Sequence, residues 1–181
     1  FLILGAGWTP IFLIPLLQDS KIKFAATTTT GHDNTIPFKF GPDSDDLSPY
    51  RKLPSANTVL VTFPLKGTGQ SKLITDLYRK VHGHKNNWIQ LGSTGIYKDE
   101  GWADENSPYD RTNTRAIAED ELMECVGGCV LNLSGLYGGS RDPKNWLARV
   151  AKTKEEVRKK DSLHLIHGDD VARAIVGVHK H

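Results

Sequence analysis

The sequence has few cysteines and almost no net charge, and each shortage excludes a class of protein. Cys125 and Cys129 are its two cysteines, too few for the disulfide framework of a small secreted domain, and they fit a reducing compartment. They supply half of a metal site at most, so we interpret both as packing thiols and predict no metal. The formal net charge is +2, which favours neither nucleic acid nor an acidic partner.

The sequence also has no long uninterrupted apolar run. Its most apolar stretch, FLILGAGWTPIFLIPLL, lacks a basic leader and a small-residue cleavage site, and glycines and two prolines interrupt it. Because of these features, we expect this stretch to be neither a signal peptide nor a membrane span. We therefore expect a cytoplasmic protein with no membrane partner. Because the chain starts on a strand without Met, we also expect a few residues to precede Phe1.

Alternating strand and helix patterns predict the fold class. The predicted strands cover residues 2–4, 21–28, 36–40, 58–63, 88–91 and 129–133. The predicted helices cover residues 10–18, 46–53, 69–81, 113–125 and 170–179. This order is typical of an α/β Rossmann-type fold, a doubly wound parallel sheet with helices on both faces. At 181 residues the chain suits one domain, over 1–181, and ligands of such sheets bind beyond the carboxyl ends of the strands.

Local patterns give four more expectations. Helical spacing places four apolar side chains on the inward face of the first helix: Ile11, Leu13, Ile14 and Leu17. Pro15 should weaken or kink that helix, because it cannot donate an N–H bond. Asp169 is a natural N-cap for the last helix. We expect residues 135–141 to form a loop.

The first strand runs into a glycine turn, GAGWTP, that is typical of a dinucleotide-binding sheet. Gly5 permits the tight turn, Gly7 lets the backbone approach a pyrophosphate, and the following helix offers free N–H groups and its positive dipole end. Pro10 replaces the third glycine of G-x-G-x-x-G, although proline suits a first helical position. Alone the motif is weak, and an ordinary strand-to-helix turn is the alternative.

Segments along the chain carry a family resemblance. They are, in order, LILGAGWT, TVLVTFP, LGSTGIY, SPYDRTNTRAIAEDEL, LNLSGLYGGSRDP and HLIHGDDVARAI. In these segments the chain resembles the extended short-chain dehydrogenase/reductase superfamily of the NAD-dependent epimerase/dehydratase type, and within it the atypical YeeZ-like branch. That family usually continues with a C-terminal substrate-binding part. We expect most of this part to be absent, shortened or outside the given sequence.

The resemblance implies positions for cofactor, catalytic and substrate residues. The implied cofactor contacts are Gly5, Gly7, Trp8, Thr9, Thr27, Thr28, Phe63, Pro64, Leu65, Ser93, Leu136 and Tyr137. Ser93 stands where the family places its catalytic Ser or Thr, and Tyr97 is a candidate proton donor. Thr94 is a candidate substrate contact, and Arg141 is a candidate for holding an anionic substrate group.

The usual catalytic pair of this family is missing. It consists of a tyrosine that exchanges a proton with a carbonyl and a lysine four residues later that lowers the tyrosine's pKa. If Tyr109 is the anchor, Asn113 stands at the lysine position; if Glu119 is the anchor, Arg111 and Arg115 take the two positions. Arginine stays protonated and cannot act as a general acid. The two arginines are therefore candidates for binding phosphates or an anionic substrate, or are solvated helix charges.

The end of the second strand bears on cofactor choice. Thr27–Thr30 includes no acidic residue to hold a ribose 2′-OH, which disfavours strict NAD specificity. Thr29 occupies the place where NADP-preferring relatives carry an arginine, and His32 is nearby. Because nothing there would repel a 2′-phosphate, we expect NAD(P) with NADP slightly preferred.

Three functional hypotheses remain open. The first is an NAD(P)-dependent oxidoreductase or epimerase acting on a small hydroxyl or carbonyl substrate, for example a nucleotide sugar, in which Ser93 with Tyr97 or an arginine replaces the missing pair. The second is a non-catalytic nucleotide-binding scaffold or redox sensor. The third is a chain that binds neither ligand. We expect a small-molecule partner and no nucleic acid, and the family's habit of pairing through helices beside the sheet allows a homodimer.

Overall fold

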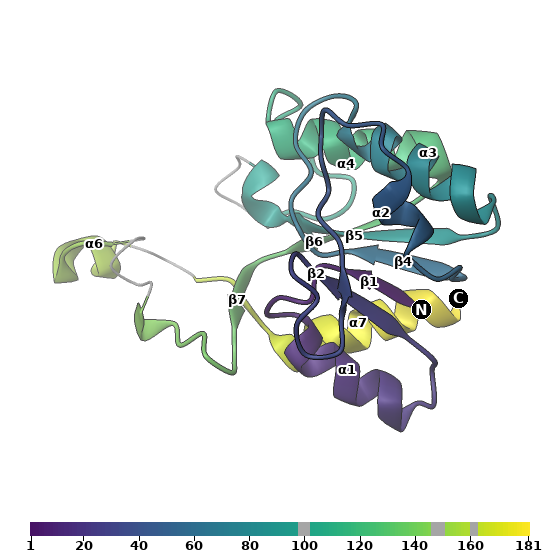
Figure 1. Ribbon diagram of the computed structural model, residues 1–181. Helices are drawn as coiled ribbons and strands as arrows, with labels where there is room; N and C mark the ends of the chain where they lie inside the picture. Colours follow the sequence, from purple (N-terminus) through teal and green to yellow (C-terminus); the bar gives the residue numbers. More distant parts are fainter. Residues whose placement is uncertain (98–101, 146–150, 160–162) are drawn as a thin grey trace.

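Six parallel strands form the central sheet of the computed structural model, which describes residues 1–97, 102–145, 151–159 and 163–181 (Figure 1). The strand order is β3-β2-β1-β4-β5-β6, and every neighbouring pair is parallel. The strands are β1 (Leu2–Leu4), β2 (Ala25–Thr28), β3 (Ile36–Pro37), β4 (Thr58–Val61), β5 (Asn87–Ser93) and β6 (Cys129–Leu133). The expected α/β Rossmann-type sheet is therefore confirmed, and its order reverses between β1 and β4, where such sheets bind ligands.

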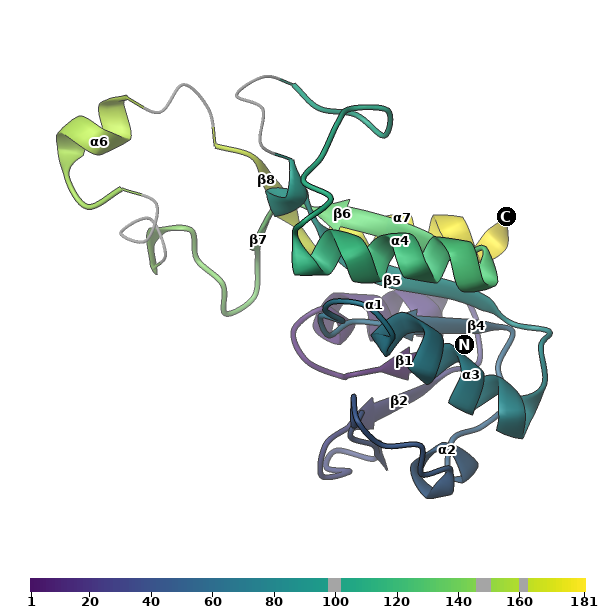
Figure 2. The same ribbon diagram turned by 90° about the horizontal axis from the view of Figure 1, so that it is seen from above.

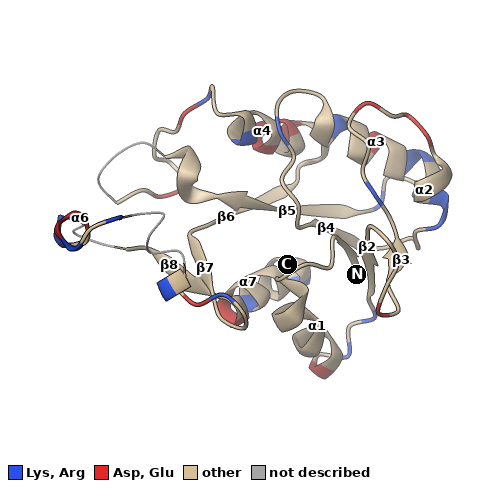
Figure 3. Cartoon of the chain, turned by 60° about the vertical axis from the view of Figure 1, so that its left-hand side comes forward, with Lys and Arg blue, Asp and Glu red and all other residues tan. Residues whose placement is uncertain are grey.

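Helices cover both faces of the sheet. One face carries α1 (Pro10–Asp19) and α7 (Gly168–Lys180), and the other carries α3 (Gln70–His82), α4 (Thr114–Val126) and the short α2 (Ser48–Arg51) (Figure 1). The alternation along β1 explains the two layers, since successive strand residues point to opposite faces. Leu2 and Leu4 join the core under α3 and α4, whereas Ile3 joins the core under α1 and α7. The strands carry no charged side chain (Figure 3).

A second, two-stranded parallel sheet lies beside the main one. It pairs β7 (Gly135–Tyr137) with β8 (Leu165–His167), so part of the segment predicted as a loop is a strand. A turn of 3-10 helix, η1 (Thr94–Ile96), follows β5. The short α6 (Lys154–Arg158) stands away from the sheet on a projecting segment (Figure 2) and carries charges of both signs (Figure 3).

Several local expectations prove wrong for identifiable reasons. Ile11 is 56% exposed, because the inward face of α1 is filled by Pro10, Leu13 and Leu17. The N-cap of α7 is His167, whose Nδ1 accepts the Asp169 N–H at 3.2 Å, so Asp169 lies inside the helix.

Pro15 lies within α1, and the helix continues past it to Asp19. Two further expectations differ from the structure. The second strand is shorter than predicted: it begins at Ala25, and Lys21 lies in the turn after α1 in a left-handed conformation (φ 55°). Cys125 is exposed and Cys129 is half-buried, both as free thiols, so only Cys129 packs as expected. Among the described helices, none is long and apolar enough to cross a membrane.

Candidate functional site

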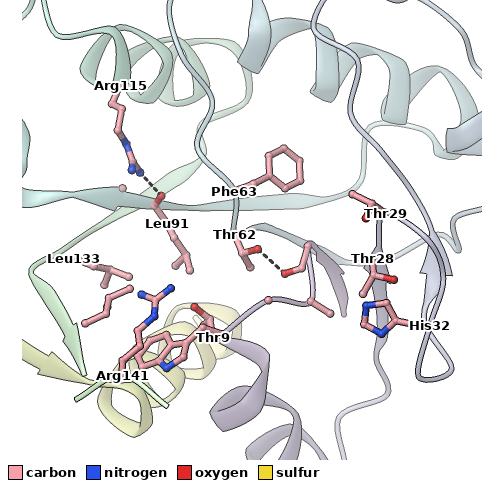
Figure 4. Close-up of a pocket in the computed structure, with 16 residues that line it drawn as sticks. Thr9, Thr28, Thr29, His32, Thr62, Phe63, Leu91, Arg115, Leu133 and Arg141 are labelled. Carbon is pink, nitrogen blue, oxygen red and sulfur yellow. Dashed lines mark hydrogen bonds between the residues drawn. The ribbon is translucent and has the colours of Figure 1, made fainter. Parts of the chain in front are cut away.

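A cleft of about 480 Å3 lies at the carboxyl ends of the central strands. Thr28, Thr29 and His32 are at one end, and Arg115 and Arg141 are at the other (Figure 4). Many of the residues proposed from the sequence line it: Gly5, Gly7, Trp8, Thr9, Thr28, Phe63, Arg115, Leu136 and Arg141. The site residues that sequence reasoning missed are their neighbours at the strand ends: Ala6, Thr62, Leu91, Gly92 and Leu133.

Hydrogen bonds from two neighbouring strands hold the glycine turn in shape. Gly5 takes a left-handed conformation (φ 98°), and its N–H donates to Thr27 Oγ1 at 3.0 Å. The Thr62 hydroxyl donates to Gly5 O at 2.6 Å, and a Cβ on Gly5 would lie 2.6 Å from this hydroxyl. Thr27 is almost fully buried and does not line the cleft, so its hydroxyl shapes the turn from beneath.

The turn presents unused hydrogen-bond donors where α1 begins. The backbone N–H groups of Trp8 and Thr9 bond to no residue in the described part of the chain, and Thr9 makes no side-chain cap. A Cβ on Gly7 would meet no atom within 4 Å, so the backbone is open to close approach. Pro10 is the first residue of α1, where its missing N–H leaves nothing unsatisfied. Free N–H groups at a helix start are what an anion needs.

Trp8 and Arg141 join the turn to the segment after β7. The Trp8 indole N–H donates to Gly138 O at 3.0 Å, and the Arg141 guanidinium carbon lies 4.6 Å from the centroid of the Trp8 ring. Gly138 and Arg141 exchange backbone hydrogen bonds of 3.0 and 3.1 Å. Stacking on the ring restrains the guanidinium while leaving its N–H donors available. Arg141 is thus a fixed positive charge at the mouth of the cleft.

Arg115 enters the cleft from the opposite side, on α4 (Figure 4). Its Nη2 donates to Leu91 O at 2.9 Å, and its Nε lies 3.6 Å from Glu119 Oε1. Burial raises the pKa of Glu119, although the Arg115 charge and an Asn132 hydrogen bond of 3.2 Å oppose that rise. Arg115 therefore places a positive charge at the cleft, next to the buried carboxyl of Glu119.

The other proposed catalytic and substrate residues do not line this cleft. The Ser93 Oγ accepts the Gly95 N–H at 3.2 Å and caps η1. The Thr94 hydroxyl donates to Leu133 O at 3.4 Å. Tyr97 packs edge-on against Tyr109 with ring centroids 6.1 Å apart.

Arg111 and Tyr109 form a separate cluster outside the cleft. The Arg111 guanidinium lies over the Tyr109 ring at 5.7 Å. The Tyr109 hydroxyl donates to Asp120 at 2.5 Å, and this hydrogen bond raises the pKa of Tyr109. The structure therefore separates Arg111 from Arg115, although both are on or just before α4.

The remaining proposed cofactor residues have other surroundings. Leu65 is fully buried in the core beneath α3. Tyr137 packs against His167 with ring centroids 5.0 Å apart. Pro64 lines a second cavity.

That second cavity, of about 520 Å3, adjoins the cleft. The two share Gly5, Thr28, Thr29 and Phe63. Phe40 and Phe63 lie in its wall as a nearly parallel pair, with centroids 6.1 Å apart and planes at 22°. Lys39 and Lys66 also line it. Among the described residues, no Asp or Glu lines either cavity, so both favour an anionic ligand.

Metal binding has no support in the described ranges. No group of three or more His, Cys, Asp or Glu side chains in them is arranged to hold a metal ion. The polar groups of the cleft are hydroxyls, backbone N–H groups, the His32 ring and the two arginines. This donor set suits phosphate or carboxylate groups better than a cation.

No protein-family model and no curated protein matches the sequence, whereas solved structures match the fold. UDP-N-acetylglucosamine 4-epimerase from Bacillus cereus aligns with a TM-score of 0.65 at 14% identity, over 99% of this chain and 73% of that one. ADP-L-glycero-D-manno-heptose-6-epimerase from Helicobacter pylori gives 0.64 at 18%, over 99% and 72%. A Bacillus cereus UDP-glucuronic acid 4-epimerase in complex with NAD gives 0.63 at 16%, over 99% and 72%. The chain therefore has the Rossmann-type α/β fold of these epimerases.

Proposed function

We propose that this protein binds NAD(P)(H) in the cleft and acts as an oxidoreductase or epimerase of the extended short-chain dehydrogenase type, in its YeeZ-like branch. The observation that carries the proposal is the glycine turn. It places the unpartnered N–H groups of Trp8 and Thr9 beside the open face of Gly7. Similar structures include complexes with NAD and a nucleotide sugar, which supports the same use of this cleft.

The residues around the turn fit a dinucleotide. The diphosphate would accept hydrogen bonds from the free N–H groups at the start of α1. The adenosine half would extend toward Thr28 and Thr29 and into the aromatic second cavity, and the nicotinamide half toward Leu136 and Arg115. Two connected cavities of about 480 and 520 Å3 provide the elongated space that such a ligand needs.

Cofactor choice favours NADP(H) over NAD(H) in this proposal. At the end of β2 the cleft is lined by Thr28, Thr29 and His32 and by no carboxylate. The Asp33 carboxylate lies 2.8 Å from His32 Nδ1 but does not line the cleft. A carboxylate there would accept from a ribose 2′-OH and repel a 2′-phosphate. Its absence supports a cofactor that carries the additional phosphate.

Two arginines at the nicotinamide end indicate an anionic substrate. When bound, the nicotinamide supplies hydride transfer. Arg115 and Arg141 would hold a carboxylate or phosphate of the substrate and polarise a carbonyl, but neither can give up a proton at neutral pH. Proton exchange would then need a group other than these arginines, such as Tyr97, after movement, or water.

A specific observation also supports a non-catalytic sensor as a second candidate. The Ser93 and Thr94 hydroxyls both bond to nearby backbone, and Tyr97 packs against Tyr109 away from the cleft. A protein in this arrangement binds the cofactor without providing the usual proton relay. It would report the redox state of the cofactor by binding one form more tightly.

Titration of the purified protein with NADPH and NADH tests the proposal. We expect nicotinamide fluorescence to change on binding, and the melting temperature to rise with ligand concentration, because ligand at a hundred times Kd stabilises by about 2.7 kcal/mol. No response to either nucleotide at millimolar concentration would overturn it. If nucleotide binds, steady oxidation of NADPH with carbonyl compounds bearing a carboxylate or phosphate supports the enzyme, and binding without turnover supports the sensor.

A further inference from the structure

Two lysines on the rim of the second cavity are not paired with any residue in the described part of the chain. Lys39 follows β3, and Lys66 follows β4, so they reach the same cavity from different parts of the chain. Both are exposed. Neither side chain forms an ion pair or hydrogen bond with any residue in the described ranges. Their charges therefore remain available to a ligand.

Nearby carboxylates do not neutralise this pair. Asp43, Asp45 and Asp46 follow Lys39 in the same loop, but none lines the cavity. Asp46 is turned to its own segment, where its Oδ1 accepts the Ser48 N–H at 2.8 Å. The rim of the cavity therefore keeps its positive charge.

The end of β2 contributes neutral hydroxyl groups to this cavity and no positive charge. The Thr28 hydroxyl lies 2.7 Å from the Thr35 hydroxyl and accepts the Gly31 N–H at 2.9 Å, so it is engaged by its own loop. Thr29 lines both the cleft and the second cavity and is neutral. Positive charge beside the cavity therefore comes from the segments after β3 and β4, and not from β2.

We propose that Lys39 and Lys66 recognise a phosphomonoester on the ribose of a bound adenosine and so select NADP(H) over NAD(H). This inference rests on the proposed binding of NAD(P)(H). A phosphate dianion accepts charge-assisted hydrogen bonds from lysine ammonium groups, which are stronger than bonds to a neutral hydroxyl. The aromatic wall of Phe40 and Phe63 would border the adenine, which leaves the phosphate on the polar rim with the two lysines.

The test compares four ligands on the folded protein: NADPH, NADH, 2′,5′-ADP and 3′,5′-ADP. The variants are Lys39→Gln, Lys66→Gln and the double variant, with Lys85→Gln as the matched control. Lys85 is exposed just before β5, at the opposite edge of the sheet from the cleft. Each lysine variant should weaken NADPH about tenfold, since one charge-assisted bond contributes about 1.5 kcal/mol. Binding of NADH and the melting temperature should not change.

Each outcome decides a different part of the argument. The proposal is supported if the natural protein binds NADPH more tightly than NADH, and if this preference is lost in the double variant and kept in Lys85→Gln. Tighter binding of 2′,5′-ADP than of 3′,5′-ADP identifies the 2′-phosphate as the recognised group. The reverse preference between the two ADP isomers would instead identify a 3′-phosphate and overturn NADP selection. Equal loss of NADPH and NADH, or no loss of either, overturns the role of the lysines while dinucleotide binding stands. Binding of no nucleotide overturns the proposed function itself.

Discussion

Gly7 and Gly92 both border the cleft, but a side chain would find empty space at one and occupied space at the other. A Cβ on Gly7 would meet no atom within 4 Å. A Cβ on Gly92 would lie 2.8 Å from Val130 Cγ1 and 2.9 Å from both Asn132 Oδ1 and Glu119 Oε1. One glycine keeps space for something outside the protein, and the other lets the protein pack against itself.

The same contrast extends to the polar groups on the two sides. At the glycine turn, the N–H groups of Trp8 and Thr9 bond to nothing in the described part of the chain. At the end of β5, Ser93 and Thr94 bond to backbone, and Glu119 and Arg115 lie against each other. The Ser93 and Thr94 hydroxyls are thus engaged by the backbone, whereas the N–H groups of the turn stay free for a ligand. The glycine turn is therefore the part of the cleft best suited to a ligand, and the end of β5 is mainly scaffold.

Substitution of Gly7 gives the largest expected effect on binding. Gly7→Val should weaken NAD(P)H about a hundredfold, or about 2.8 kcal/mol, because the side chain would occupy the approach to the free N–H groups. Gly7→Ala should give a smaller loss. Neither should lower the melting temperature, since no atom of the protein lies in that space. Unchanged affinity in a folded Gly7→Val protein would place the ligand elsewhere.

Substitution of Gly92 should have the opposite character. Gly92→Ala should lower the free energy of unfolding in urea by about 1–3 kcal/mol, because the added methyl overpacks the space beside Glu119 and Val130. The control is Gly177→Ala in α7, where the Cβ would meet nothing within 4 Å. That change should be neutral or stabilising, because alanine favours helix. Equal stability of both variants would show that the space beside Gly92 is not filled.

Ser93 tests whether the end of β5 is scaffold alone. Ser93→Ala should lower the free energy of unfolding by about 1 kcal/mol, through loss of the cap on Gly95. Nucleotide affinity should stay unchanged, because Ser93 does not line the cleft. Ser93→Thr keeps the hydroxyl and should recover the lost stability. A selective loss of turnover in Ser93→Ala, with stability kept, would move Ser93 from scaffold to catalysis.

Glu119 gives a smaller effect that depends on pH. Burial raises the pKa of Glu119 above its ordinary value of 4.5, so the folded protein holds this proton more tightly than the unfolded chain. Its contribution to stability is fully present below pH 4.5 and is lost as pH rises through the folded pKa. The advantage of the natural protein over Glu119→Gln in urea unfolding should therefore shrink from pH 4 to pH 7.

Glu124→Gln is the control for this pH dependence, because Glu124 is exposed on the same helix. The difference in free energy of unfolding between Glu124→Gln and the natural protein should not shrink in the same way from pH 4 to pH 7. An advantage over Glu119→Gln that grows with pH would mean that attraction to Arg115 outweighs burial.

Much of the fold could be predicted from the sequence because its signals are local. Apolar runs such as Thr58–Val61 and the helical spacing along α3 depend only on neighbouring residues. β7 was missed because a three-residue strand that begins with Gly135 and is followed by Gly138 gives no periodic signal, and its partner β8 is far along the chain. A strand was predicted over 36–40, but β3 covers only Ile36–Pro37, so the pattern placed Lys39 within a strand and did not indicate that it borders a cavity.

The site was predicted most directly where the backbone itself forms it, although side chains such as Phe63, Arg115 and Arg141 were also placed at the cleft. The glycine turn acts through N–H groups, so the spacing of Gly5 and Gly7 was enough to locate it. For Ser93 and Tyr97 the direction of a side chain matters, and a shift of one residue reverses it in a strand. Arg115 and Arg111 differ for the same reason, since tertiary contacts with Leu91 and Tyr109 decide which of them enters the cleft.

The central position of β1 also has a consequence for folding. Both of its neighbours, β2 and β4, come later in the chain, and the helix that follows it packs against α7, near the last residue of the sequence. During synthesis, the middle of the sheet cannot form until Thr58–Val61 has left the ribosome and can pair with Leu2–Leu4. The apolar face of α1 stays uncovered for longer still. Partners so distant in sequence slow folding, so a chaperone that shields this first apolar stretch should increase the yield of folded protein.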